Sequence, residues 1–459
     1  MNRLSVFAGA ADLVAAEAVV SGGMLDELDV ADALSQLVDK SLVGFDDDND
    51  AGVRYRLLES IRQYAQERLE TSGDAGEVRR RHADFYVARA EAAAPRLRSR
   101  DQIETVNEVA RDVDNFRAAL DWAVEAPSLD HALRLVASLG VQQTAIGYAA
   151  LDWAETAVEI PDASGHPLYP VVASWAAWAA TLRGDLERAG ALAASVEAAE
   201  AVLGSRQPAA CFGPAVARFF GGDFDWARVA AQEGVERARE SGDPWELAYA
   251  LSMFGGTLLL ADRDLAVATL EEAVRVSRDG GIASALAITL VGLAGALPPD
   301  DSRVLAVLEE ASDVAASTGD RQAVAMSSLM KATIAARTGQ WRTALRASAD
   351  AAERGLQLGD MITLGQSYWA AVFAFAGLGH LEPAAVLAGP ADLRVDHSRA
   401  PWAIEDVDLA ALTDDALLEG LGDERYAALR DRGAALQPTE AVAYLRAEAE
   451  RVLGDEPAH

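Results

Sequence analysis

The segment RYRLLESIRQYAQERL, residues 54–69, changes its hydrophobic period near the middle. Its first part alternates, with Tyr55 and Leu57 on one side and Arg54 and Arg56 on the other, which predicts a half-buried β-strand. In its second part, apolar residues recur at the spacing of an amphipathic helix. They are Ile61, Tyr64, Ala65 and Leu69, with Ser60 as the expected N-cap. The segment therefore predicts a strand that leads directly into a helix.

The residues upstream supply the other parts of a small domain. FAGAADLVAAEAVV at residues 7–20 predicts a turn at Gly9 and then a helix that Asp12 caps. DVADALSQLVDKSLVGF at residues 29–45 predicts a second helix followed by an extended segment. DDDNDAG at residues 46–52 predicts the turn of a hairpin. The order helix, helix, strand, turn, strand, helix is that of a winged helix whose hairpin is the wing.

The predicted wing is acidic, which argues against DNA binding, although helix-turn-helix relatives often place a helix in the major groove. Aspartates in the turn at 46–52 would lie where phosphates approach, and the preceding helix offers Lys40 as its only basic residue. Arg54 and Arg56 are the other local candidates for phosphate contacts. We therefore expect the domain to pack against a protein neighbour, and DNA binding remains the alternative.

The composition limits the classes of function. The 459 residues include 40 basic and 72 acidic side chains, and the net charge of −32 disfavours binding to nucleic acids and to anionic membranes. No run of about 18 uninterrupted apolar residues and no secretion signal are evident, so we expect a cytoplasmic protein without a membrane segment. The single cysteine, Cys211, is interpreted as a small core residue.

The second half of the chain repeats a pattern of turns. Short turn sequences such as GDLERA, GDFDWA and GQWRTA begin at 184, 222, 261, 299, 339 and 379. A second series alternates with the first and comprises Gly204, Gly242, Gly280, Gly319 and Gly359. Two interleaved series with one period predict antiparallel helix pairs stacked as a solenoid. The pattern resembles the tetratricopeptide repeat, lengthened from 34 residues to about 39.

Small residues recur at fixed positions near these turns, where they would let the two helices approach closely. Those after the first turn series are Ala189, Ala227, Ala266, Ala344 and Ala384. Together these patterns predict a mainly α fold, with a winged-helix-like domain followed by a tetratricopeptide-like superhelical solenoid. The expected domains are 1–75, the winged-helix-like domain; 76–160, a helical connector; 161–400, the repeats; and 401–459, a C-terminal helical cap.

We find no catalytic constellation in the sequence. Neither Lys40 nor Lys331 lies in a GxxxxGK[ST] phosphate loop, and the six histidines show no metal-ligand spacing. We therefore expect a protein that is not an enzyme, with no cofactor site and no metal site.

The first helices of the repeats carry apolar and aromatic residues where tetratricopeptide arrays line their concave side. These residues suggest an apolar groove that binds a partner or effector. The candidates are Trp178, Phe212, Phe219, Phe220, Trp369 and Phe373. The alternative is that longer helices close the solenoid tightly and bury these rings as core.

Five segments together resemble a known family. They are RLSVFAGAADLVAAEAV, ALSQLVDKSLV, RYRLLESIRQYAQERLETSGD, RRRHADFYVARAEAA and DVDNFRAALDWAV. In order and spacing they resemble the region downstream of the nucleotide-binding module in bacterial STAND-type regulators, predicted ATPases that often carry a cyclase-like domain or a LuxR-type helix-turn-helix. The closing segment LGDERYAALRDRGAALQPTEAVAYLRAEAE resembles the end of their helical array.

This resemblance implies that the winged helix packs on an NTPase module and that the superhelix acts as sensor and autoinhibitory arm. Residues 1–459 contain neither the phosphate-loop module nor the LuxR-type domain, so no nucleotide-binding residue is carried over. The expected function is a non-catalytic regulatory module that binds a protein partner, the STAND NTPase module in cis or in trans, or a small effector. No direct nucleic-acid contact is expected.

Two alternatives remain. One is a DNA-binding transcription factor that acts through the winged helix. The other is a non-functional fragment of a longer LuxR-type regulator, in which the apolar residues Leu4, Val6 and Phe7 would lie exposed.

Overall fold

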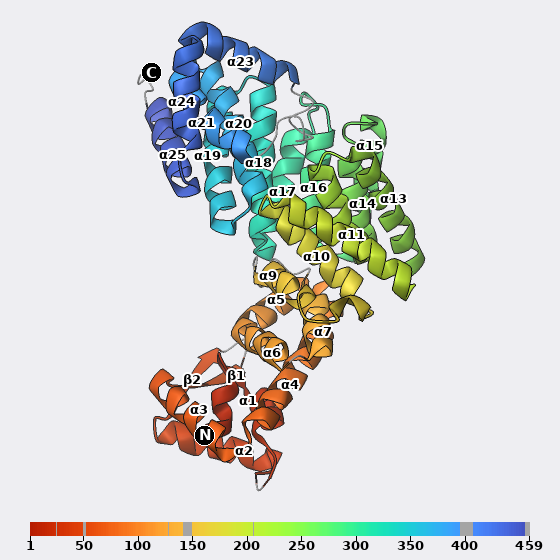
Figure 1. Ribbon diagram of the computed structural model, residues 1–459, viewed down its shortest axis with the longest axis vertical. Coiled ribbons are helices and arrows are strands. Elements are labelled where there is room, and N and C mark those ends of the chain that lie inside the picture. Colours follow the sequence, from red (N-terminus) through yellow and green to blue (C-terminus); the bar gives the residue numbers. More distant parts are fainter. Residues whose placement is uncertain are drawn as a thin grey trace. The chain divides into compact units, whose positions relative to one another are not determined.

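The computed structural model describes residues 1–23, 25–48, 52–126, 128–140, 149–204, 206–394 and 407–454 (Figure 1). Its internal contacts divide the chain into two compact units, Met1–Val172 and Ala173–His459. The predicted winged helix and the predicted helical connector lie together in the first unit.

The first unit begins with a winged helix. Its elements are the 3₁₀-helix η1 (Asn2–Val6), β1 (Ala11–Asp12), α1 (Leu13–Val20), α2 (Glu27–Asp39), β2 (Val43–Asp48), β3 (Gly52–Leu57) and α3 (Glu59–Ser72). The three strands form an antiparallel sheet in the order β1-β3-β2, with Phe45 opposite Tyr55 in the hairpin. The predicted order of helices and strands is confirmed. The Asp12 carboxylate accepts from the Ala15 N–H at 2.8 Å and caps α1, as predicted.

Three details differ from the prediction. The sequence pattern did not indicate η1 and β1, which are too short for periodicity to reveal them. The hairpin turn was predicted from residue 46, but β2 continues to Asp48, because backbone pairing depends little on side-chain charge. Ser60 was predicted as the N-cap of α3, whereas the helix begins at Glu59, with Leu58 at the cap position.

The rest of the first unit is helical. Its elements are α4 (Ala75–Leu97), α5 (Gln102–Arg111), α6 (Val113–Glu125), α7 (Leu129–Leu139), α9 (Ala149–Val158) and the 3₁₀-helix η2 (Ala163–Gly165). Tyr86 of α4 lies at the centre of the core, with ring centroids 6.4 Å from Phe7 and 5.5 Å from Phe116. Phe7 and Leu4 are only 4% and 8% exposed, contrary to the exposed surface that the fragment alternative predicts.

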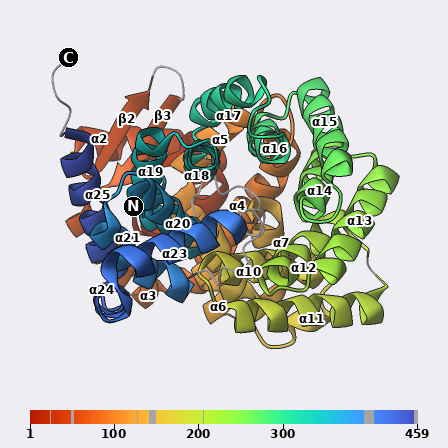
Figure 2. The ribbon, with the colours of Figure 1, turned by 90° about the horizontal axis from the view of Figure 1, so that it is seen from above.

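The second unit consists of helix pairs. Helix α10 (Tyr169–Leu182) spans the border between the two units, and α11 (Leu186–Leu203) follows it. The pairs are α12 (Phe212–Phe220) with α13 (Phe224–Ser241), α14 (Pro244–Leu258) with α15 (Arg263–Gly280), α16 (Ala283–Ala296) with α17 (Val304–Thr318), α18 (Arg321–Arg337) with α19 (Trp341–Leu358), and α20 (Met361–Gly377) with α21 (Leu381–Arg394). The short 3₁₀-helix η3 (Pro208–Cys211) precedes α12. From α11 to α21 each helix contacts the next, and Figure 2 shows them following one another in chain order.

Local sequence explains how these pairs turn. Gly204, Gly242, Gly319 and Gly359 end their helices in the left-handed conformation, with φ between 65° and 74°. Gly280 was predicted in this series, but it is still helical, and the left-handed residue is Gly281. The alanines expected at the close contacts are fully buried, which confirms that role: Ala189, Ala227, Ala266, Ala344 and Ala384.

The last three helices are α23 (Val407–Leu421), α24 (Asp423–Ala434) and α25 (Pro438–Gly454). Helix α24 crosses α21 at backbone contact, because glycines face the partner helix on both sides. A Cβ atom placed on Gly433 would lie 1.7 Å from the Val386 carbonyl oxygen, and one on Gly389 would lie 2.1 Å from the Arg430 carbonyl oxygen. Only glycine permits this approach.

We expect Gly433→Ala to lower the free energy of unfolding by at least about 1–3 kcal/mol, because α24 must move away from α21 to admit the methyl group. Urea unfolding followed by circular dichroism measures the change. Gly190→Ala in α11 is the control, since a Cβ there meets no atom within 4 Å and Ala favours the helix. Equal stability of the two variants would contradict the backbone contact.

Candidate functional site

Helix α2 takes the place of a recognition helix, directly before the hairpin, yet its exposed surface is acidic. Its exposed residues include Glu27, Leu28, Asp29, Asp32, Ser35, Gln36 and Asp39. Lys40, at the end of the helix, is the exposed basic residue of this surface. Residues 1–70 as a whole carry 14 acidic and six basic side chains. A phosphate backbone would therefore meet mostly like charge at this face.

Arg54, one of the few basic candidates for a phosphate contact in this domain, is used inside the first unit. Its guanidinium donates to the Ala10 carbonyl oxygen at 2.5 Å and to the Asp112 carboxylate at 2.5 Å. Its side chain is only 12% exposed. Another candidate, Arg56, lies on the surface.

Asp112 belongs to a charged network that we name the wing joint, formed by Asp12, Arg54, Arg89 and Asp112. Arg89 of α4 lies 3.0 Å from Asp112 and 2.5 Å from Asp12, while Arg54 of β3 pairs with Asp112. Asp112 stands between α5 and α6 and is 1% exposed. The wing joint thus connects the wing, the start of α1, helix α4 and the corner of α5 and α6.

The two carboxylates of the wing joint differ in their environment. Burial raises the pKa of Asp112 above its usual value, and the charges of Arg89 and Arg54 offset only part of that effect. Burial also acts to raise the pKa of Asp12, but hydrogen bonds from Arg89 and the Ala15 N–H outweigh it and hold this pKa below the usual value.

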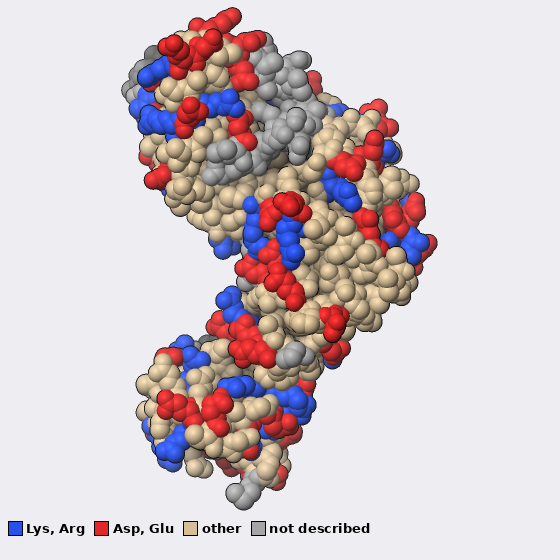
Figure 3. All heavy atoms as spheres, viewed as in Figure 1, with Lys and Arg blue, Asp and Glu red and all other residues tan. Residues whose placement is uncertain are grey.

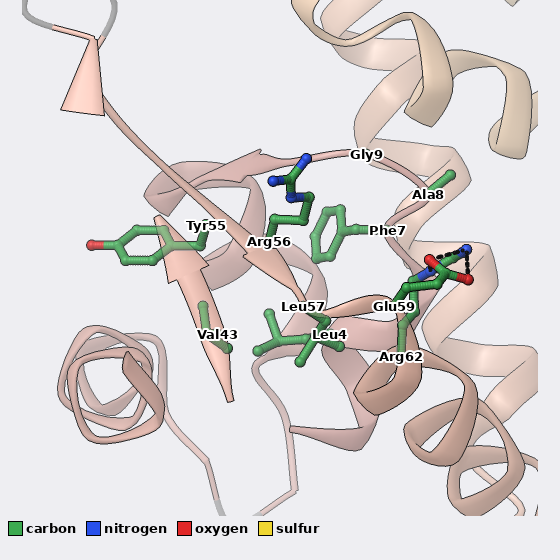
Figure 4. A pocket seen from close by; sticks show the side chains of 10 residues that line it. All are labelled: Leu4, Phe7, Ala8, Gly9, Val43, Tyr55, Arg56, Leu57, Glu59 and Arg62. Atoms are coloured by element: carbon green, nitrogen blue, oxygen red, sulfur yellow. Dashed lines mark hydrogen bonds and ion pairs between the residues drawn. The ribbon is translucent and has the colours of Figure 1, made fainter. Parts of the chain in front are cut away.

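A surface pocket lies beside the wing joint, where the strand β3 leads into α3 (Figure 4). It has a volume of about 40 Å³ and is lined by Leu4, Phe7, Ala8, Gly9, Val43, Tyr55, Arg56, Leu57, Glu59 and Arg62. Leu4, Phe7 and Leu57 are buried and form its apolar wall. Glu59 and Arg62 form an ion pair with a shortest distance of 2.9 Å at its rim.

Asn115 of α6 holds one wall of this pocket in place. Its side-chain oxygen accepts from the backbone N–H groups of Ala8 at 3.0 Å and Gly9 at 3.3 Å, and its amide donates to Ala10. Asn115 is fully buried. A Cβ on Gly9 would lie 3.3 Å from the Asp114 Cβ, so the backbone passes close to α6.

His82 lies behind the pocket wall, with its ring centroid 5.3 Å from that of Phe7. The side chain is 3% exposed, and burial lowers its pKa to about 4. The ring is therefore neutral at physiological pH and packs in the core.

The predicted aromatic groove residues lie mostly in the core. Phe212, Phe219, Trp369 and Phe373 are 1%, 6%, 5% and 7% exposed, and Trp178 and Phe220 are half-buried. First helices of successive pairs, such as α18 and α20, contact one another and close over these rings. The core alternative therefore describes the first four rings, and we assign them no partner. Figure 3 shows a face with few charged side chains over the helices drawn yellow in Figure 1.

Other types of site are not evident among the described residues. No group of three His, Cys, Asp or Glu residues there could hold a metal ion, and no described helix combines the length and the apolar character needed to cross a membrane. Cys211 is buried, and burial raises the pKa of its thiol to about 12, so it is not a reactive thiolate.

Sequence reasoning missed the wing joint and the pocket. The segment DVDNF contains both Asp112 and Asn115, and two polar residues at buried positions of a helical pattern were the available signal. Arg54 lies 58 residues before Asp112 and Ala8 lies 107 residues before Asn115, beyond the reach of local periodicity.

Comparisons with known proteins support this architecture. Residues 1–70 match the family described as winged helix-turn-helix domain. A stretch of 138 residues is 44% identical to Rv0890c of Mycobacterium tuberculosis (strain ATCC 25618 / H37Rv), provisionally named as an HTH-type transcriptional regulator. The match covers 30% of this chain and 15% of that protein. The chain thus spans a small part of the relatives that it matches.

Two solved structures are similar in fold. The first is the STAND protein PH0952 with a tetratricopeptide repeat sensor from Pyrococcus horikoshii, at a TM-score of 0.51 and 15% identity, covering 98% of this chain and 64% of that one. The second is a Rap protein complexed with Competence and Sporulation Factor, at a TM-score of 0.45 and 13% identity, covering 79% of this chain and 99% of that one. The first similarity establishes the fold alone, and the second supports no inference.

We expect Phe373→Ala to lower the free energy of unfolding by roughly 3–5 kcal/mol, because it removes a ring from the core of the second unit. Urea unfolding measures the loss. Phe220→Ala is the same change at a half-buried position and should cost less. If Phe373→Ala left the stability unchanged, the ring would not be part of the core and would again be a candidate for binding a partner.

Asp112→Asn should destabilise the first unit by about 3–5 kcal/mol, because it removes the buried carboxylate that pairs with Arg54 and leaves Arg89 with Asp12 alone. Hydrogen exchange of β3 and α4 locates the effect, and urea unfolding measures it. The control is Glu91→Gln. Glu91 is also on α4, and its half-exposed ion pair with Arg134 of α7 should contribute at most about 1 kcal/mol. A similar loss in both variants would argue against a special role of the wing joint.

Proposed function

We propose that this protein is a non-catalytic regulatory module whose winged helix docks on a partner protein and whose helical repeats form the sensor arm of a STAND-type or HTH-type regulator. The observation that carries the proposal is the distribution of acidic and basic side chains in the winged helix. The recognition-helix position is acidic, and Arg54, one of the two basic residues of the wing strand β3, is held by Asp112 inside the first unit.

The internal pairing of Arg54 has an energetic consequence. A phosphate contact would have to separate Arg54 from Asp112, which is 1% exposed and would be left short of a partner. Breaking one side of a buried ion pair costs roughly 3–5 kcal/mol. A surface contact between an arginine and a phosphate returns less than that, so the wing favours internal pairing over DNA.

The comparisons agree with a regulatory role. A relative that matches 138 residues of this chain is provisionally named as an HTH-type transcriptional regulator, and a STAND protein shares the fold over nearly the whole chain. From these we infer that the partner is an NTPase module of the STAND type, joined to this chain or separate from it. We propose that the chain itself is a control element without an active site of its own.

The test is ATP hydrolysis by purified STAND-type ATPases of the source organism, measured with and without this chain. We expect the chain to slow hydrolysis by one of them at least about fivefold, the size of a modest coupling free energy. Serum albumin at equal concentration is the control. Unchanged rates for every such ATPase would contradict the proposal.

DNA binding is the competing outcome and is measured in the same preparation by fluorescence anisotropy at about 50 mM salt, where non-specific contacts are strong. The chain should not bind a duplex, whereas a variant with Asp29→Lys, Asp32→Lys and Asp39→Lys should bind one weakly. These three residues are exposed, so the fold is kept. Sequence-specific binding by the unaltered chain would favour the transcription-factor alternative.

A further inference from the structure

We infer that the pocket between the wing and α3 is the docking point for a partner segment that presents an apolar side chain next to a carboxylate. The inference rests on the proposed function and deepens it by stating the chemistry of the partner. The pocket lies at the strand-to-helix junction within residues 54–69, where the hydrophobic period of the sequence changes.

The size and lining of the pocket fit one aliphatic side chain. Leu4, Phe7, Val43 and Leu57 are at most 8% exposed and form an apolar wall. The volume of about 40 Å³ is that of a few water molecules, since one water needs roughly 10–15 Å³. A branched side chain would displace water that the apolar wall binds poorly, which is the arrangement of an interface hot spot.

Two exposed apolar residues neighbour lining residues of the pocket, one across the hairpin and one along the chain. Phe45 is 53% exposed and stands opposite Tyr55, a lining residue, in the hairpin register. Leu58 is 49% exposed and stands between the lining residues Leu57 and Glu59 in the chain. Large apolar side chains left exposed around a hollow indicate a contact surface rather than a solvated one.

The charges of the lining residues indicate which polar group the partner segment should carry. Glu59 and Arg62 at the rim pair with one another through three hydrogen bonds of 2.9–3.1 Å, and so neutralise each other. Arg56 is the third charged lining residue and is exposed, which leaves the pocket with one net positive charge. The lining residues alone are thus cationic on a chain with a net charge of −32, and the Asp114 carboxylate lies beside the lining residue Gly9. A carboxylate of the partner is the complement of the cationic lining.

The pocket is also built on a rigid frame. Asn115 binds the backbone of Ala8 and Gly9 on one wall, and the wing joint holds Arg54 on the strand that supplies Tyr55, Arg56 and Leu57. A site with a fixed shape loses little conformational entropy when it binds. A ligand in this pocket would therefore act on α4 and α6 through the residues of the pocket wall that contact these helices.

The probe is N-acetylleucine, which combines an isobutyl side chain with a carboxylate. It is titrated into the full chain with ¹³C-labelled Leu and Val methyl groups, and the methyl signals of Leu4, Val43 and Leu57 are followed by NMR. We expect saturable shifts at these methyls with a Kd of about 1–10 mM, as a ligand of this size allows. N-acetylleucinamide, which lacks the carboxylate, should bind about two- to fivefold more weakly.

Arg56→Gln should reduce the affinity for N-acetylleucine to that for the amide, while Arg346→Gln, an equal change of charge at an exposed residue of the second unit, should not. Absent shifts, equal affinity for acid and amide, equal shifts with inorganic phosphate, or shifts confined to the second unit would each overturn the inference. Failure of this titration leaves the ATPase result untouched, and a negative ATPase result leaves the titration untouched, so the two proposals fail separately.

Discussion

The ion pairs of Asp112 are the constraint on which the first unit depends. A carboxylate that is 1% exposed is costly to bury unless cations and hydrogen bonds surround it, and here Arg54 and Arg89 do so from two different elements. The wing, the start of α1, helix α4 and the α5–α6 corner must therefore meet at one point. Such a requirement specifies one arrangement of the hairpin on the helices, as a purely apolar contact would not.

The same constraint supports the proposal that the winged helix binds protein rather than nucleic acid. Because the guanidinium of Arg54 is used internally, the surface that remains is acidic along α2 and apolar around the pocket of β3 and α3. Asn115 and Asp112 lie within four residues of one another in the chain, and together they hold both the pocket wall and the wing. Structural support and the candidate docking surface are thus two consequences of one short segment.

The second unit is stabilised differently, because each helix pair contains its own capping residues and its own close helix contacts. Aspartates cap the starts of helices, left-handed glycines end them, and buried alanines set the spacing within a pair. Stacking of such pairs builds a continuous core from contacts between neighbours. The aromatic rings of the first helices become part of that core because the first helices also touch one another.

The sequence by itself determined the features that depend on neighbouring residues: the order of the winged helix, the period of about 39 residues, the Asp12 cap and the small residues at close contacts. These follow from periodicity and capping, which act over a few residues. Only the tertiary structure decided that Arg54 binds Asp112, 58 residues away, and that Phe212 and Trp369 are core rather than groove. A hydrophobic pattern shows which residues avoid water, but whether a neighbouring helix or a partner covers them depends on contacts between distant parts of the chain.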